Sequence, residues 1–396
     1  MRLFKTVCLL SLMISITLFG QPFPQVEPSQ VGLNSDKLVQ TDTVIQKAIQ
    51  QGDIPGAVLL VLRHGKSAYY KAYGHRQIVP EKEVMTKNTI FDVASITKPV
   101  ATATSAMMLL EQGKLRLLDL VSHYFPHFKA WKGEDGRRRS IRIIHLLTHT
   151  SGLPPYAPVE ELKTRFGTSQ PDSLFDYIAK VDRQHAPGKR FIYSCLNFIT
   201  LQRIIEKISG ESLSALSEKY IFDPLSMQDT YFLPDDSVID QCAPTEIYKD
   251  EGLLRGKVHD PLARLMMECN SGNAGLFSTA GDMAIFAQMM LNNGQLNGKR
   301  ILSAASVKAM TELPIGYEKF GRGLGWDLNS AYASNQGDLL SEATYGHTGY
   351  TGTSIVIDPI NDLAIILMTN RVHPEDTGNV VRLRSLVANV VASAIE

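Results

Sequence analysis

The sequence predicts an α/β protein of the α+β type, in which an antiparallel sheet is flanked by helices and a mainly helical lobe is inserted between its strands. β-rich patterns occur at residues 56–74 and return only after residue 323. Between these two regions, apolar residues recur at helical spacing. Strands from the two ends of the chain can share one sheet only if the middle is an insertion. We therefore expect the functional site in the cleft between two lobes.

The first part of the chain predicts a helix, a hairpin and a second helix, in that order. Apolar residues are spaced as in a helix over residues 36–51. Two short β-rich runs, 56–62 and 67–74, are separated by Arg-His-Gly-Lys, which is typical of a β-hairpin. Residues 97–112 are rich in Ala, Met, Thr and Leu and end before a glycine. This composition predicts a buried helix.

The middle of the chain is predicted to be helical, and strands return near the C-terminus. Further helices are expected at 141–149, 173–180, 197–209, 212–221 and 282–292. The later strands are expected at 323–328, 345–346, 353–358 and 363–370, before a last helix at 380–394. No stretch resembles a linker, so residues 21–396 are predicted to be a single domain. Its α/β lobe would comprise about 31–115 and 300–396, and its helical lobe about 116–299.

The first twenty residues have the layout of a secretory signal peptide. Arg2 and Lys5 precede an apolar run from Val7 to Phe19, which is followed by Gly20. The run is short for a membrane span, and no span is expected in the mature chain. We therefore expect a signal peptide at 1–20 and an exported protein, periplasmic or secreted. Leu18 fits poorly at the minus-three position of a Gly20 cleavage site, so an uncleaved N-terminal anchor is the alternative.

Charge and cysteine content exclude several classes of protein. The 40 Lys and Arg residues balance 40 Asp and Glu residues. Loss of Arg2 and Lys5 with the signal peptide would leave a net charge of about −2, which favours neither nucleic acid nor anionic membrane as a partner. Three cysteines remain after export, so at most one disulfide can form. The fold is not expected to depend on disulfides.

The segment Ser95-Ile96-Thr97-Lys98 is the first candidate for catalysis. Residues at i and i+3 share one face of a helix, so the Lys98 amine can reach the Ser95 hydroxyl. A hydroxyl nucleophile needs such a base, and burial among apolar neighbours would lower the pKa of the lysine. The pattern occurs once in the chain. By itself it also fits a helix that begins with Ser95 as N-cap and carries a solvated lysine.

Two later segments strengthen the catalytic interpretation. Residues 191–195, Phe-Ile-Tyr-Ser-Cys, precede an amphipathic helix, and residues 346–352, Gly-His-Thr-Gly-Tyr-Thr-Gly, precede a strand-like run. With Ser95 to Lys98, they give Ser-x-x-Lys, Tyr-Ser-Cys and His-Thr-Gly in order. This set resembles the class C β-lactamase family, whose motifs are Ser-x-x-Lys, Tyr-x-Asn and Lys-or-His-x-Gly.

The resemblance extends from about Val31 to the C-terminus. The family also includes penicillin-binding proteins, esterases, DD-peptidases and D-aminopeptidases. Three further segments look like the family: 146–153, 224–227 and 273–279. The resemblance implies a β-lactamase/transpeptidase-like fold and a cofactor-free serine hydrolase that acts through an acyl-enzyme.

The resemblance also implies a role for each matching residue. Ser95 would be acylated, and Lys98 and Tyr193 would share the work of the general base. Tyr193 would later help to activate the deacylating water, for which the neighbouring Lys98 cation could depress its pKa. The backbone N–H groups of Ser95 and Tyr350 would form the oxyanion hole. His347 would line the strand edge and contact the substrate or the Tyr193 network.

Cys195, His347, Thr348 and Gly349 would bind the substrate, and two of them depart from the family pattern. Cys195 stands where many relatives have Asn, whose amide binds the amide of the substrate. His347 stands where β-lactamases usually have Lys, so a positive charge for the substrate carboxylate requires protonated His347. These departures favour a carboxylesterase, or a peptidase acting on D-amino-acid substrates, over a true β-lactamase.

Other chemistries are less well supported by the sequence. No Gly-x-Ser-x-Gly elbow and no phosphate-binding glycine loop occurs. His145 and His149 lie at i, i+4, but the Glu of a His-Glu-x-x-His zinc site is absent, so no metal is expected. Ser151 is interpreted as a turn residue. Cys195 could act as a reactive thiol, although a passive residue facing the substrate is the preferred interpretation.

The sequence therefore predicts an exported serine hydrolase acting through Ser95 on ester or amide substrates, including peptides with D-amino acids. The expected partner is a small-molecule or peptide substrate, which includes cell-wall peptides. A true β-lactamase or a DD-carboxypeptidase is the alternative within this chemistry. A non-catalytic binder of cell-wall peptides is the alternative from another class, and the intact Ser95, Lys98 and Tyr193 argue against it.

Overall fold

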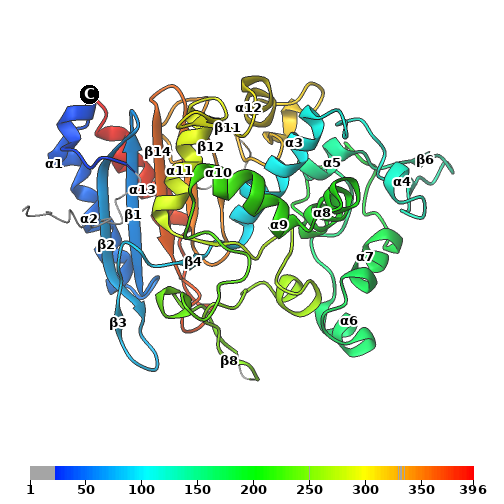
Figure 1. Cartoon of the computed structure of the whole chain (residues 1–396), viewed down its shortest axis with the longest axis horizontal. Helices are drawn as coiled ribbons and strands as arrows, with labels where there is room; N and C mark the ends of the chain where they lie inside the picture. Colours follow the sequence, from blue (N-terminus) through cyan, green and yellow to red (C-terminus); the bar gives the residue numbers. More distant parts are fainter. Residues whose placement is uncertain (1–22, 249, 329, 331, 334) are drawn as a thin grey trace, which may run out of the picture.

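A six-stranded antiparallel sheet joins the two ends of the chain, with strand order β12-β13-β14-β1-β2-β3 (Figure 1). A computed structural model describes residues 23–248, 250–328, 330, 332, 333 and 335–396. The expected signal peptide at 1–20 lies outside the described residues. Figure 1 shows the helical lobe to one side of the sheet, as the fold prediction requires.

The N-terminal hairpin and the C-terminal strands supply the sheet. The hairpin consists of β1 (Gly56–Arg63) and β2 (Lys66–Gln77), and β3 (Glu83–Val84) lies at the edge. The C-terminal strands are β12 (Tyr345–Thr348), β13 (Ser354–Asp358) and β14 (Leu363–Thr369). The two sets meet where β1 pairs with β14, with Leu59 opposite Leu367. This long-range pairing confirms that the helical middle is an insertion.

Helices cover both faces of the sheet. On one face, α2 (Gln40–Gln50) and α13 (Val381–Ser393) pack over alternate residues of β1 and β14. On the other face lies α11 (Ala280–Leu291) (Figure 1). Every residue of β1 is buried, because one alternating set of side chains faces each helical layer.

The position of α11 corrects the expected boundary at residue 299. The sequence analysis placed residues 282–292 in the helical lobe, but α11 packs against β14, β1 and β13. Ten of the 12 residues of α11 are apolar or glycine, and they are distributed around the whole helix. The helix is buried from Ala280 to Met290. A helix that is apolar all round is typically buried between two layers, which is where α11 lies.

The helical lobe is built around α8 (Cys195–Ser209), which packs against α3 (Thr104–Glu111), α5 (Ile143–Leu147) and α7 (Pro171–Lys180). The remaining helices are α1 (Ser35–Leu38), α4 (Val121–Tyr124), α6 (Val159–Phe166), α9 (Leu213–Ser217), α10 (Asp223–Leu225) and α12 (Ala304–Thr311). None of the helices within the described residues combines the length and the apolar character that a membrane crossing requires.

Short irregular elements connect these parts. The 3₁₀ turns are η1 (Pro28–Val31), η2 (Ala94–Ile96), η5 (Ile239–Gln241) and η7 (Glu318–Phe320). The π-helical turns are η3 (Lys98–Ala103), η4 (Glu218–Phe222) and η6 (Leu262–Met266). Four two-stranded ladders pair β4 (Phe91–Asp92) with β9 (Phe277–Ser278), β5 (Trp131–Lys132) with β6 (Arg138–Arg139), β7 (Ile247–Tyr248) with β8 (Gly252–Leu253), and β10 (Gln295–Leu296) with β11 (Lys299–Arg300).

Three local predictions differ from the structure. The helix expected at 97–112 begins as the π-helical turn η3 and continues as α3. The helix expected at 212–221 is likewise divided into α9 and η4. The strand expected at 323–328 is a loop with isolated bridges, Arg322 to Asp327 and Asp327 to Gly346. Its glycines, Gly323 and Gly325, weaken a strand, and Gly325 has a φ of +90°.

Candidate active site

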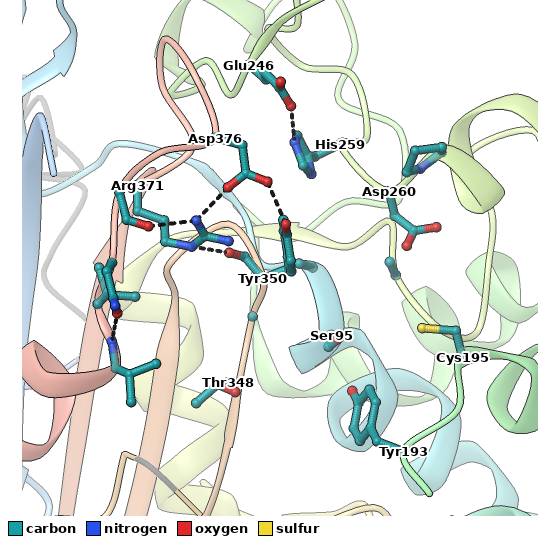
Figure 2. A pocket seen from close by; sticks show the side chains of 18 of the residues that line it. Ser95, Tyr193, Cys195, Glu246, His259, Asp260, Thr348, Tyr350, Arg371 and Asp376 are labelled. Atoms are coloured by element: carbon teal, nitrogen blue, oxygen red, sulfur yellow. Dashed lines mark hydrogen bonds and ion pairs between the residues drawn. The ribbon is translucent and has the colours of Figure 1, made fainter. Parts of the chain in front are cut away.

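Ser95 lies on a tight turn between β4 and η3. The preceding residue, Ala94, has a left-handed backbone with φ of 46°. A left-handed alanine is uncommon, and its N–H donates to Asp92 Oδ1 over 2.8 Å. Thr97 Oγ1 closes the turn from the other side by donating to the carbonyl of Ala94 over 2.6 Å. These bonds hold the turn so that the partly exposed Ser95 projects into a cavity (Figure 2).

Lys98 lies fully buried one turn after Ser95. Its Nζ donates to Ser95 Oγ over 2.9 Å and to the carbonyl of Asn273 over 2.8 Å. The same nitrogen lies 3.7 Å from Cys195 Sγ and 5.0 Å from the centre of the Tyr193 ring. A π-helical turn starts at Lys98, a local geometry that is frequent at functional sites. The predicted contact between Ser95 and Lys98 is therefore present.

The charge state of Lys98 differs from the sequence expectation. Burial acts to lower its pKa, but the interactions of the amine with Cys195, Tyr193 and Asp260 act in the opposite direction, and the net pKa is raised. The expectation that burial would lower this pKa is therefore wrong in its direction. Lys98 is an ammonium group at neutral pH, and in that state it donates a hydrogen bond to Ser95.

Tyr193 is held between two aromatic rings beside Lys98. His149 stacks on one side with ring centres 4.3 Å apart, and Tyr332 stacks with ring centres 5.1 Å apart. Nδ1 of His149 accepts the N–H of Ser194 over 3.1 Å and the side-chain amide of Asn197 over 3.2 Å. Burial, followed by the charges of Arg322 and Lys98, lowers the pKa of His149 well below its usual range. A neutral imidazole therefore fixes the plane of the tyrosine.

The backbone amides of Ser95 and Tyr350 are available as oxyanion donors. Across the described part of the chain, neither N–H donates to another backbone carbonyl. Both residues line the same cavity. Tyr350 lies in the turn between β12 and β13, which approaches the Ser95 turn closely: Thr353 Oγ1 donates to the carbonyl of Val93 over 3.1 Å.

Gly349 allows this close approach. A Cβ atom at residue 349 would lie 2.1 Å from Thr353 Oγ1 and 2.5 Å from the carbonyl oxygen of Val93. Side-chain atoms do not reach such distances, so another residue would separate the two turns. The glycine of the His-Thr-Gly motif therefore serves the packing of the site, and it also lies on the cavity wall.

Asp92 and Arg371 hold the two sides of the predicted oxyanion hole. Besides Ala94, Asp92 binds the N–H of His259 through Oδ2 over 2.7 Å, and its carbonyl accepts Thr351 Oγ1 over 2.7 Å. Arg371 Nε donates to the carbonyl of Tyr350 over 2.8 Å. These contacts connect residues on both sides of the cavity.

Asp376 completes the support of Tyr350. Its carboxylate accepts the Tyr350 hydroxyl over 2.5 Å and the Arg371 guanidinium over 2.6 Å. His259 stacks on the Tyr350 ring with ring centres 5.7 Å apart. Figure 2 shows this group of side chains above Ser95. Sequence reasoning missed Asp92, His259, Arg371 and Asp376, because the contacts join segments that are far apart in the chain.

A cavity of about 990 Å³ opens in front of Ser95. Of the predicted site residues, Ser95, Tyr193, Cys195, Thr348, Gly349 and Tyr350 line it. His347 does not: it is 3% exposed, and its Nδ1 bonds to the carbonyl of Thr348. Its ring centre lies 6.2 Å from that of Tyr193. The structure therefore places His347 behind the wall, beside the Tyr193 network.

His347 does not supply the positive charge that β-lactamases place at this position. Burial and then the charges of Arg322 and Lys98 lower its pKa well below its usual range, so the ring is neutral at neutral pH. Cys195 begins α8 and carries a buried thiol whose pKa is raised, chiefly by burial. The thiol is therefore protonated at neutral pH, which argues against a reactive thiolate in the resting enzyme.

Arg384, on α13, is a cation that contacts the strand motif on the cavity wall. It donates to the carbonyls of Gly349 and Thr353 over 2.7 and 2.8 Å and is 7% exposed. Burial and then the charge of Arg371 lower its pKa to about 9. Within the described residues it forms no ion pair, and no group of three His, Cys, Asp or Glu side chains could hold a metal ion.

The fold and this arrangement of serine, lysine and tyrosine define an enzyme of the serine hydrolase class with a β-lactamase/transpeptidase-like fold. Residues 41–389 match the beta-lactamase family. The chain belongs to that family. Its predicted resemblance to β-lactamases, penicillin-binding proteins and esterases is thereby confirmed.

Similar proteins in the family carry several functional names. A Salmonella typhimurium protein, provisionally named D-alanyl-D-alanine carboxypeptidase, is 33% identical, and the alignment covers 93% of this chain and 91% of that protein. The structure of EstCE1, a hydrolase with promiscuous acyltransferase activity, matches 90% of this chain and 99% of its own with 26% identity and a TM-score of 0.72. A class C beta-lactamase matches 92% of this chain and 97% of its own, with 21% identity and a TM-score of 0.71.

Replacement of Gly349 by alanine tests the close approach of the two turns. We expect kcat/KM for a nitrophenyl ester to fall about 100-fold, the size of loss that follows when an oxyanion donor is misplaced. Gly52→Ala is the control for a strained glycine site away from the cavity: a Cβ atom at residue 52 meets no atom within 4 Å, and the strain of its φ of +78° is confined to the backbone. Steady-state kinetics of both variants provide the measurement. An equal loss in the two variants would show that the effect is not local to the site.

Proposed function

We propose that this enzyme hydrolyses ester and amide bonds through a covalent acyl-enzyme on Ser95. The observation that carries the proposal is the hydrogen bond of 2.9 Å between Lys98 Nζ and Ser95 Oγ, at the floor of a cavity that also contains Tyr193. A nucleophile, a charged group and a candidate base are within one site, as acyl transfer requires.

Acylation begins with attack of Ser95 Oγ on the substrate carbonyl carbon. Tyr193, beside the Lys98 ammonium, acts as the base and accepts the hydroxyl proton as the C–O bond forms. The developing oxyanion binds the N–H groups of Ser95 and Tyr350. When the tetrahedral intermediate collapses, the leaving alcohol or amine takes the proton from Tyr193. The products of this step are the free leaving group and the Ser95 ester.

Deacylation uses the same groups, with water as the nucleophile and Ser95 as the leaving group. Tyr193 accepts a proton from a water molecule, whose oxygen attacks the acyl carbon. Collapse of the second intermediate returns the proton to Ser95 and releases the carboxylic acid. Lys98, whose Nζ lies 5.0 Å from the centre of the Tyr193 ring, places a positive charge beside the base in both steps. The stacking of His149 and Tyr332 on Tyr193 keeps its hydroxyl in position.

Short peptides that end in D-amino acids, and esters of similar size, are the proposed substrates. The name of the Salmonella relative supports peptides, and that of EstCE1 supports ester and acyl-transfer chemistry. Arg384 supports a carboxylate-bearing substrate, since it is a buried cation without an anionic partner in the described residues. The neutral His347 supports our ranking of efficient β-lactam hydrolysis below these activities.

Export of the mature chain to the periplasm or the medium is part of the proposal. It is supported by the charged and apolar pattern of residues 1–20. Cell-wall peptides would be available to an enzyme in that compartment. An N-terminal anchor that is not cleaved would give the same exposure to substrate.

Covalent labelling tests the assignment of Ser95. A fluorescent fluorophosphonate should label the wild-type protein and fail to label Ser95→Ala, because only an activated serine reacts. Ser151→Ala is the matched control, since Ser151 is buried and its Oγ donates to Asn197. In-gel fluorescence of folded samples gives the result. Equal labelling of wild type and Ser95→Ala would disprove the assignment.

The pH dependence of Tyr193→Phe tests which group is the base. The wild-type kcat/KM for an ester should rise with pH along the limb that reports deprotonation of the general base. The raised pKa of Lys98 keeps the charge of that lysine over this range. Tyr193→Phe should lower kcat/KM by about 100- to 10,000-fold and remove this rise. Retention of the rising limb in Tyr193→Phe would instead identify Lys98 as the base.

A further inference from the structure

The cavity wall contributed by the helical lobe carries one charged side chain beside Cys195. Around Cys195 this wall is formed by Pro155, Tyr156, Cys195, Asp260, Pro261 and Ala274, while Tyr193, Glu246, Tyr248 and His259 form the rest of it. Apart from Asp260 the members of the part around Cys195 are apolar or have neutral polar groups. Figure 2 shows the Asp260 carboxylate directed into the space between Cys195 and the Tyr350 side of the cavity.

Asp260 lacks a cationic partner among the described residues. One carboxylate oxygen, Oδ1, accepts the N–H of Ala263 over 2.9 Å and so caps the turn η6. Of the other acids of the cavity, Asp376 forms an ion pair with Arg371 over 2.6 Å, and Glu246 is engaged by His259 Nε2 at 3.0 Å. Asp260 forms no ion pair in the described residues and is therefore a carboxylate of this cavity that a charged ligand can neutralise.

The surroundings of Asp260 favour an ionic interaction. Tyr156 and Cys195 are half-buried and line the same cavity, and the charge of Asp260 is among those that raise the pKa values of Tyr156, Cys195 and Lys98. Because apolar walls reduce screening by water, a charge at this place acts more strongly than a charge on an open surface. The Cys195 thiol is a poor hydrogen-bond partner, so Asp260 is the strong acceptor on this wall.

We infer that Asp260 binds a protonated amine on the acyl portion of the substrate. The inference rests on the proposed function, since it places the ammonium group on the side of Ser95 where Cys195 lies. With Arg384 on the opposite side of the cavity, the enzyme would select zwitterionic substrates, such as short peptides or amino esters. Asp260 is then a specificity-determining residue, and it takes no part in proton transfer.

Paired esters and the variant Asp260→Asn test this inference. The probes are nitrophenyl esters of glycine, β-alanine, 4-aminobutanoate and 6-aminohexanoate, each compared with the ester that has methyl in place of ammonium. Asn can still accept the Ala263 N–H, so the cap of η6 is kept while the charge is removed. The measured quantity is the ratio of kcat/KM between the two members of each pair.

In the wild type, kcat/KM for at least one amino ester should exceed kcat/KM for its methyl partner by about ten- to hundredfold, as expected for a hydrogen bond to a charged group. In Asp260→Asn this ratio should fall to about one, whereas Glu246→Gln should keep it because Glu246 is paired with His259. Equal ratios in wild type and Asp260→Asn would overturn the inference.

The same experiment separates this inference from the proposed function. Hydrolysis of the methyl esters by the wild type, and its loss in Ser95→Ala, depends on the acyl-enzyme and not on Asp260. If those esters are hydrolysed without any preference for amines, the Asp260 inference fails while the proposed function stands. If no ester is hydrolysed, the proposed function fails.

Discussion

The buried carboxylate of Asp92 is the constraint on which the arrangement of the site depends. Its two oxygens bind the N–H groups of Ala94 and His259, and its carbonyl accepts the Thr351 hydroxyl. Ala94 precedes Ser95, and Thr351 follows Tyr350, so one residue fixes the neighbours of both predicted oxyanion donors. Burial raises the pKa of this carboxyl, and the N–H donors of His259 and Ala94 oppose the effect. Removal of one of these donors would leave a buried carboxylate oxygen without a hydrogen bond, which lowers the stability of the fold.

The fold brings these segments together because one open sheet pairs strands from the two ends of the chain. Pairing of β1 with β14 places the β12–β13 turn next to the strand β4 that leads to Ser95. The helical insertion then supplies Tyr193, Cys195 and Asp260 from the opposite side. The cavity is thus a product of long-range pairing, and its walls carry different charges: Asp260 on the helical side and Arg384 on the sheet side.

The sequence was sufficient for the fold class, which follows from local patterns, and its resemblance to the family selected three residues that the structure brings together. Hydrophobic periodicity located the strands of the hairpin and of the C-terminus, and three short motifs pointed to Ser95, Lys98 and Tyr193. The charge of Lys98 was not predictable, because it depends on Cys195, Tyr193 and Asp260, which approach only in the folded chain. The burial of His347 and the contacts of Asp92 were missed for the same reason. Apolar residues on all sides of α11 were a signal in the sequence that this helix packs between two layers, and they could have placed it against the sheet.

The central claim is that Ser95 and Tyr350 present two amides to the oxyanion of a Ser95 adduct. A crystal structure of the protein with phenylboronic acid tests this most directly, because the boronate is a tetrahedral mimic of the intermediate. The account predicts boron bonded to Ser95 Oγ, with one boronate oxygen about 2.7–3.1 Å from both amide nitrogens. Boron on another residue, or an oxygen beyond hydrogen-bond distance of either amide, would contradict it.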